Sequence, residues 1–122
     1  MGKRVMVVDD SRVIELQMRK LLEETDYEVA AYCRDGESAI TAYAEVKPDL
    51  VTMDIIMPGM DGLETARTIL EEHPEAKILM VSSLAYDDTI SEAKEIGAKD
   101  FIYKPFDRDQ ILAAFDKVMA EE

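Results

Sequence analysis

The 122-residue chain has few of the residues that mark disulfide-bonded or membrane-spanning proteins. Its single cysteine, Cys33, has no partner for an internal disulfide, which favours a reducing compartment. No apolar run is much longer than a strand, far short of the ~18 residues typical of a membrane span. Residues 1–4 lead directly into an apolar stretch without the features of a signal peptide. We therefore expect a cytoplasmic protein that does not enter a membrane.

Positive charge is also scarce in this sequence. There are 14 lysines and arginines against 27 aspartates and glutamates, which gives a formal net charge of −13. Such a charge repels nucleic acid phosphates, so we expect no direct nucleic acid binding. Cations and basic protein surfaces are the expected partners. The length and the 48% hydrophobic content suit one domain with one core, which we place over residues 1–122.

Short apolar runs alternate along the chain with segments whose apolar residues have helical spacing. Five strands are predicted, at residues 4–8, 27–31, 50–53, 77–81 and 100–103. Ser11 and Asp61 are placed to cap helices, and Gly97 follows a predicted helix end. Alternating strands and helices predict an α/β fold: a doubly wound, flavodoxin-like (βα)₅ domain with a parallel sheet of order 2-1-3-4-5.

Reactive side chains stand where four of the five predicted strands end. They are Asp9 and Asp10 after the first strand, Asp54 after the third, Ser82 and Ser83 after the fourth, and Lys104 after the fifth. In the order 2-1-3-4-5 these four strands are neighbours, and doubly wound sheets bind ligands beyond the carboxyl ends of their strands. We therefore expect the side chains to converge on one pocket between the first and third strands.

Three carboxylates in one pocket predict a cation site. Repulsion among Asp9, Asp10 and Asp54 is relieved either by proton uptake or by a bound cation. Oxygen ligands with room for water favour Mg²⁺ over Ca²⁺, and the lack of His and Cys in the group disfavours zinc. Lys104 adds a positive charge and Ser82 a hydroxyl donor, both suited to a phosphoryl group in transfer. Asp54, on a central strand, is the predicted nucleophile that forms an aspartyl phosphate.

Each of these residues has a simpler structural explanation when it is considered alone. Asp9 and Asp10 could cap the helix that follows them. Asp54 could be a turn residue, and Lys104 a solvated cation before Pro105. Their joint placement at matching strand ends favours a functional site over four separate structural roles.

The sequence resembles the receiver domains of two-component response regulators, of the CheY-like type, over almost its whole length. The matching segments are VVDDS at 7–11, DIIMPGMDG at 54–62, VSS at 81–83 and KPF at 104–106. The resemblance implies that Asp54 is the phosphoacceptor. It also implies that Asp10, Asp54 and the backbone carbonyl of Ile56 ligate Mg²⁺, while Asp9 holds the ion through water.

The same resemblance implies roles for the remaining strand ends. Lys104 contacts the phosphoryl oxygens, Ser82 moves toward them, and the Lys104–Pro105 peptide is cis. Phe101 stands where the family often has a switch tyrosine. Phe101 and Tyr103 share one face of their strand, on the side where the fourth and fifth helices and many partners are expected.

Two apolar residues are implied to set the lifetime of the phosphoryl group. Ile56 and Leu84 correspond to positions that border the path of the hydrolytic water. Because both are apolar, we expect them to restrict that water and to slow self-dephosphorylation.

The predicted function is a phosphorylation-activated switch rather than a multiple-turnover enzyme, although the domain assists its own phosphorylation and dephosphorylation. The lone histidine, His73, precedes Pro74 and is interpreted as a loop residue, so the phosphodonor is expected to be a sensor histidine kinase. A stand-alone chemotaxis-type or phosphorelay regulator is the simplest interpretation.

Three alternatives stay open. The chain could be a receiver domain from a longer transcription factor or enzyme. An aspartyl-nucleophile phosphatase is disfavoured because such enzymes usually place a second acid two residues beyond the nucleophile, where this chain has Ile56. A scaffold that is never phosphorylated is disfavoured by the complete set of strand-end residues.

Overall fold

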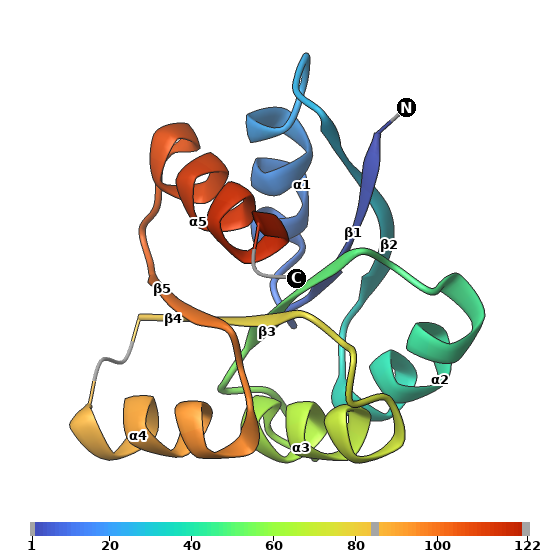
Figure 1. Cartoon of the computed structure of the whole chain (residues 1–122), viewed down its shortest axis with the longest axis vertical. Coiled ribbons are helices and arrows are strands. Elements are labelled where there is room, and N and C mark those ends of the chain that lie inside the picture. The colour runs from blue at the N-terminus through green and yellow to red at the C-terminus, as the bar shows by residue number, and fades with distance from the viewer. Residues whose placement is uncertain (1, 84–85, 121–122) are drawn as a thin grey trace.

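The computed structural model describes residues 2–83 and 86–120 of the chain. Within these residues five strands alternate with five helices (Figure 1). The strands are β1 (Lys3–Val8), β2 (Tyr27–Cys33), β3 (Leu50–Asp54), β4 (Ile78–Ser82) and β5 (Asp100–Tyr103). The helices are α1 (Arg12–Leu21), α2 (Gly36–Val46), α3 (Gly62–Glu72), α4 (Asp87–Ile96) and α5 (Arg108–Ala120).

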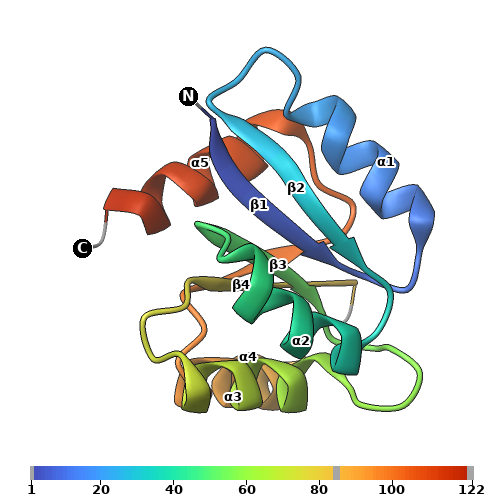
Figure 2. The same ribbon diagram turned by 90° about the vertical axis from the view of Figure 1, so that its right-hand side faces the viewer.

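The strands form one parallel sheet in the order β2-β1-β3-β4-β5, which confirms the predicted doubly wound, flavodoxin-like arrangement. Helices α1 and α5 cover one face of the sheet, and α2, α3 and α4 cover the other (Figures 1 and 2). Because β1 lies between β2 and β3, the chain leaves β1 and β3 toward opposite faces. The carboxyl ends of these two strands therefore border a crevice, as the switch-point rule predicts.

Each face of the sheet has its own apolar core. Met6, Met53 and Met80 pack with α2, α3 and α4 on one face, whereas Val7 and Leu79 pack with α1 and α5 on the other. These residues alternate along strands that are buried on both faces, which explains why β1, β3 and β4 are almost continuously apolar. Each such side chain contributes roughly 1.5–3 kcal/mol on burial, so the core holds the strand ends in a fixed register.

The predicted strand boundaries are correct to within two residues. The largest difference is at β2, which continues to Cys33 because Tyr32 and Cys33 pair with Val7 and Val8 of β1. Asp54 and Ser82 are the last residues of β3 and β4 rather than the residues that follow them. Their backbones are therefore held by the sheet.

The helix boundaries show one error. The Asp61 side chain accepts a hydrogen bond from the Glu64 N–H (2.8 Å), and Gly97 ends α4 with φ of 101°, both as predicted. Ser11 occupies the N-cap position of α1, but its side chain makes no capping bond. Its own N–H donates to Asp9 Oδ1 (2.8 Å), so the acidic residue organises this turn instead. In residues 2–83 and 86–120, every helix is too short or too polar to span a bilayer.

Candidate functional site

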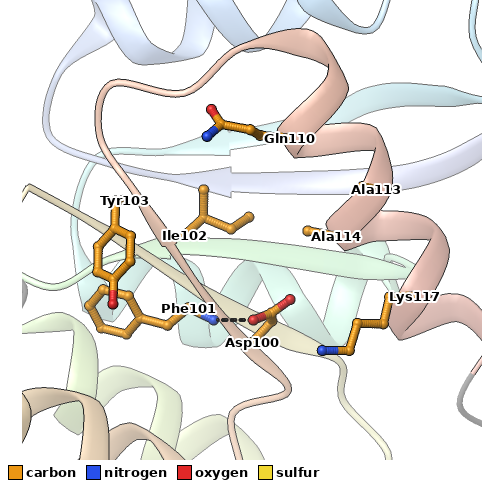
Figure 3. A pocket seen from close by; sticks show the side chains of 8 residues that line it. All are labelled: Asp100, Phe101, Ile102, Tyr103, Gln110, Ala113, Ala114 and Lys117. Atoms are coloured by element: carbon orange, nitrogen blue, oxygen red, sulfur yellow. Dashed lines mark hydrogen bonds between the residues drawn. The ribbon is translucent and has the colours of Figure 1, made fainter.

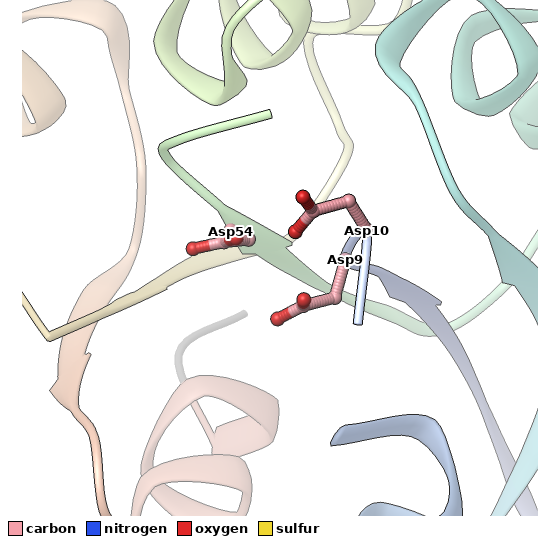
Figure 4. A group of neighbouring side chains, drawn as sticks. All are labelled: Asp9, Asp10 and Asp54. Atoms are coloured by element: carbon pink, nitrogen blue, oxygen red, sulfur yellow. The ribbon is translucent and has the colours of Figure 1, made fainter. Parts of the chain in front are cut away.

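Three carboxylates meet where β1 and β3 end. Asp9 and Asp10 follow β1 directly, and Asp54 is the last residue of β3, the strand beside it. One carboxylate oxygen from each residue lies within 4.8 Å of the others, and Figure 4 shows the three side chains gathered at this edge. Asp9 is 2% exposed and Asp54 7%, whereas Asp10 faces solvent. The predicted convergence of these residues is confirmed.

Lys104 brings a positive charge from the far side of the same pocket. Its Nζ lies 2.8 Å from Asp9 Oδ2 and 3.4 Å from Asp54 Oδ1. The backbone positions it, because the Lys104 N–H donates to the Ser82 carbonyl (3.0 Å) as β5 ends beside β4. The Lys104–Pro105 peptide is cis, as the resemblance implies. The Lys104 ammonium group therefore forms ion pairs with two buried carboxylates, those of Asp9 and Asp54.

Burial is the main reason that the pKa of Asp54 rises to about 6. The neighbouring Asp9 charge adds to the rise, and Lys104 opposes it. For Lys104, burial lowers the pKa, but the hydrogen bond to Asp9 and the charge of Asp54 outweigh burial and leave it raised. At neutral pH Asp54 is thus ionised and Lys104 protonated. The three carboxylates are then only partly neutralised.

The donor set fits a hard divalent cation. All three side chains offer oxygen, and the exposed side of Asp10 leaves room for water ligands. Mg²⁺ prefers a few carboxylates with water and phosphate oxygens to a complete protein cage. Asp9 and Asp54 already share Lys104, so a cation would have to share or replace that partner. The residues present are therefore suited to Mg²⁺.

Ser82 and Ile56 are the other two predicted site residues near Asp54 that the structure describes. Ser82 is buried at the end of β4, one residue beyond Val81, the β-sheet partner of Asp54. Ile56 belongs to the loop after β3, and its side chain is 57% exposed. An apolar side chain two residues beyond Asp54 is therefore open to solvent. Leu84, the other residue expected to restrict water, lies outside the described residues.

The aromatic pair on β5 lies as the strand alternation predicts. The ring centroids of Phe101 and Tyr103 are 5.3 Å apart. Phe101 packs against the core on the α3 and α4 side, whereas Tyr103 is 51% exposed. The two residues therefore run from the core to the surface on one side of the strand.

Two features of the site were not predicted from the sequence. Glu15 of α1 is buried and pairs with Arg19 Nε (2.6 Å), and its spacing of three and seven residues before the buried Met18 and Leu22 is the signal that could have indicated this. Gly36 and Gly62 begin α2 and α3 in close contact with the loop that follows Asp54. The contacts of Gly36 join segments distant in sequence, so no local pattern reveals them.

A sequence model of the response regulator receiver domain matches residues 5–116. The chain belongs to this family. It is 44% identical over 116 residues to protein CcdB of Bacillus subtilis, covering 95% of this chain and 97% of that protein. It is 41% identical over 118 residues to the chemotaxis protein CheY of Thermotoga maritima, covering 97% and 98%.

Solved structures agree with this assignment. The crystal structure of the CheX–CheY–BeF₃–Mg²⁺ complex from Borrelia burgdorferi matches with a TM-score of 0.91 and 32% identity, over 95% of this chain and 88% of that one. The receiver domain described here is therefore of the CheY type. Receiver domains are regulatory switches of two-component signalling, which agrees with the predicted class of function.

Proposed function

We propose that this receiver domain accepts a phosphoryl group on Asp54 from a phosphohistidine of a sensor histidine kinase and passes the signal on by a change of conformation. The observation that carries the proposal is the position of Asp54. It is a buried carboxylate beside Asp9 and Asp10, with Lys104 Nζ 3.4 Å from its Oδ1. The solved Borrelia CheY complex contains beryllofluoride and Mg²⁺, which supports the same chemistry here.

In the proposed transfer, an Asp54 carboxylate oxygen attacks the phosphorus as the bond to the donor imidazole nitrogen breaks. That nitrogen leaves with the bonding electron pair, and the imidazole regains a neutral form. Mg²⁺, when bound through Asp9, Asp10 and Asp54, would offset the charge on the phosphoryl oxygens. Lys104 contributes a fixed positive charge, and the Ser82 hydroxyl a hydrogen bond after a short movement. These new contacts favour the active conformation.

Acetyl phosphate tests this proposal without a cognate kinase. We expect the wild-type chain to gain one phosphoryl group by intact mass when Mg²⁺ is present, and none when the metal is chelated. Asp54→Asn should stay unlabelled under both conditions. Steady release of phosphate from a simple phosphomonoester would instead support the phosphatase alternative. Absence of labelling in the wild type would support an unphosphorylated scaffold.

The surface around β5 is the proposed binding face for the downstream protein. A groove of about 320 Å³ lies between β5 and α5, with Tyr103 at one end and the small Ala113 and Ala114 along α5 (Figure 3). A second groove of about 330 Å³ lies between α4 and β5. Both grooves share Phe101 and Tyr103, so movement of this aromatic pair would alter both at once.

The charge of this face favours an acidic partner. Lys94, Lys99 and Lys117 line the second groove in a chain with a net charge of −13. Within residues 2–83 and 86–120 none of these three lysines makes an ion pair. Three unpaired lysines against the single Asp100, in a groove that Ile90 and Phe101 also line, suit a partner segment that carries carboxylates beside an apolar anchor. We expect beryllofluoride with Mg²⁺ to shift the NMR signals of Phe101 and Tyr103.

Ile56 is expected to prolong the phosphorylated state. Its exposed apolar side chain lies two residues beyond Asp54, where a polar side chain could hold an attacking water. Ile56→Asn should therefore shorten the lifetime of the phosphoryl group, because the amide can hold and orient the attacking water. Ile56→Leu, which stays apolar, should leave it unchanged. A phosphate-release assay with equal decay in both variants would show that Ile56 does not control the water.

A further inference from the structure

Gly62 lies directly on the backbone of the phosphoacceptor. A Cβ at this position would come 1.9 Å from the Asp54 carbonyl oxygen, 2.7 Å from its carbonyl carbon and 2.8 Å from Ile55 Cα. The Gly62 N–H also donates to the Ile55 carbonyl (2.7 Å), which closes the intervening loop. All three crowded atoms are backbone, so no side chain can rotate away. The first turn of α3 approaches this closely only because residue 62 has no side chain.

Gly36 lies close to the other end of the same loop, at Met60. It is the first residue of α2, and a Cβ there would come 2.1 Å from Thr65 Oγ1 and 3.2 Å from Met60 Cβ. Thr65 is fully buried, and its hydroxyl donates to the Asp61 carbonyl (2.8 Å). The ends of the loop at residues 55–61 are thus confined between the first turns of two helices.

Space, rather than backbone conformation, explains these two glycines. Positive φ angles among the described glycines occur at Gly59 (75°) and Gly97 (101°), not at Gly36 or Gly62. Alanine at a helical position normally favours the helix over glycine by up to about 1 kcal/mol. Both helices therefore begin with the poorer helix former at the point where a methyl group would meet the loop.

We propose that Gly36 and Gly62 are positioning residues for the metal and phosphoacceptor site. By letting α2 and α3 close on the two ends of the loop, they fix the Asp54 carboxylate and the backbone of Ile56. Gly62 acts on the Asp54 peptide itself, and Gly36 acts through Thr65 and Met60. This inference rests on the proposed function, because it assigns these residues a role in holding Mg²⁺ and presenting Asp54.

Gly62→Ala and Gly59→Ala form a matched pair for the first test. Both change glycine to alanine near the same loop, but a Cβ at Gly59 meets nothing within 4 Å and costs only backbone strain. Isothermal titration calorimetry should show Mg²⁺ affinity about tenfold weaker in Gly62→Ala, as expected when groups that orient a metal ligand are disturbed. Gly59→Ala should stay within about twofold of the wild type. Equal affinities in the two variants would overturn the role of Gly62.

Thr65→Ala supplies a rescue test for Gly36. Oγ1 is the only Thr65 atom among the three nearest to the added Cβ, so its removal relieves the main clash. Gly36→Ala should weaken Mg²⁺ binding several-fold, whereas Gly36→Ala combined with Thr65→Ala should match Thr65→Ala alone. A double variant as weak as Gly36→Ala would contradict the contact. This cycle tests the role of Gly36 even if circular dichroism shows that Gly62→Ala does not fold.

Measurements on the wild type distinguish failure of the proposed function from failure of this inference. If it binds no Mg²⁺ and takes no phosphoryl group, the proposed function fails and this inference falls with it. If it does both while Gly36→Ala and Gly62→Ala bind Mg²⁺ as tightly as the wild type, only the inference is overturned. If the inference holds, the rates at which Gly36→Ala and Gly62→Ala are phosphorylated should recover in part at saturating Mg²⁺, because a higher metal concentration offsets a weaker metal site.

Discussion

Replacement of Lys104 by methionine should slow phosphorylation of Asp54 by about 10²-fold, because loss of one preorganised charge-stabilising group typically costs this much. Lys104 Nζ contacts both Asp9 (2.8 Å) and Asp54 (3.4 Å), and methionine keeps the length of the side chain without its charge. The initial rate of labelling by acetyl phosphate at saturating Mg²⁺ measures the effect.

Lys99→Met is the matched control for this experiment. Lys99 precedes β5 at the end of the sheet opposite the carboxylates, and it lines the groove beside α4 instead. It loses the same charge, so a general effect of net charge on the acidic chain would slow both variants. Equal rates for Lys104→Met and the wild type would show that this ion pair is structural only.

Asp54→Asn should stabilise the metal-free protein at neutral pH. The folded pKa of Asp54 is about 6, while an unfolded aspartate titrates near 3.9. The folded state therefore binds the proton more tightly, and this group's contribution to stability falls as pH rises from about 4 to about 6. A difference of two pKa units corresponds to about 3 kcal/mol of stability that the wild type loses when Asp54 ionises. Asparagine does not ionise, so the Asp54→Asn variant keeps this stability. The pKa of about 6 already includes the opposing charge of Lys104, so we expect the variant to gain up to about 3 kcal/mol at pH 7.

Denaturant unfolding with a chelator at pH 4 and pH 7 measures this difference. We expect the variant and the wild type to agree near pH 4, to separate as pH rises toward 6, and to differ by a constant amount above pH 6. Mg²⁺ at about 100 times its dissociation constant should then raise the free energy of unfolding of the wild type by about 2.7 kcal/mol. The free energy of unfolding of the variant should rise much less. A variant that is less stable than the wild type at pH 7 would mean that burial does not dominate the site.

Lys104 and a metal ion would compete for the same carboxylates, Asp9 and Asp54. Lys104 bonds to Asp9 and lies near Asp54. A divalent cation supplies the charge that these buried groups lack, which would free the ammonium group for phosphoryl oxygens. This exchange is a physical reason for metal to precede phosphorylation.

The sequence was most informative about the strand ends. Asp9, Asp54 and Lys104 could be placed together because parallel strands in a known order end at one edge. The partner that Lys104 bonds most closely could not be predicted, since Asp9 and Asp54 flank the same space and side-chain rotamers decide between them. The Lys104–Asp9 contact is therefore a structural finding.

Nonlocal contacts explain most of what the sequence did not reveal. Ser11 has the residue type of a helix cap, but Asp9, two positions earlier, takes its N–H instead. Gly36 and Gly62 look like ordinary turn residues until the loop after Asp54 is seen against them. In each case the deciding atom belongs to another part of the chain or to a competing side chain, which periodicity does not register.

Borohydride trapping tests the identity of the phosphoacceptor most directly. The reagent reduces an acyl phosphate to an alcohol, so a phosphorylated aspartate becomes homoserine and is located by peptide mass spectrometry. After treatment with acetyl phosphate and Mg²⁺, we predict homoserine at residue 54 alone, and none when Mg²⁺ is chelated. Homoserine at Asp9 or Asp10, or its absence from every peptide of a chain that binds Mg²⁺, would contradict the assignment of Asp54.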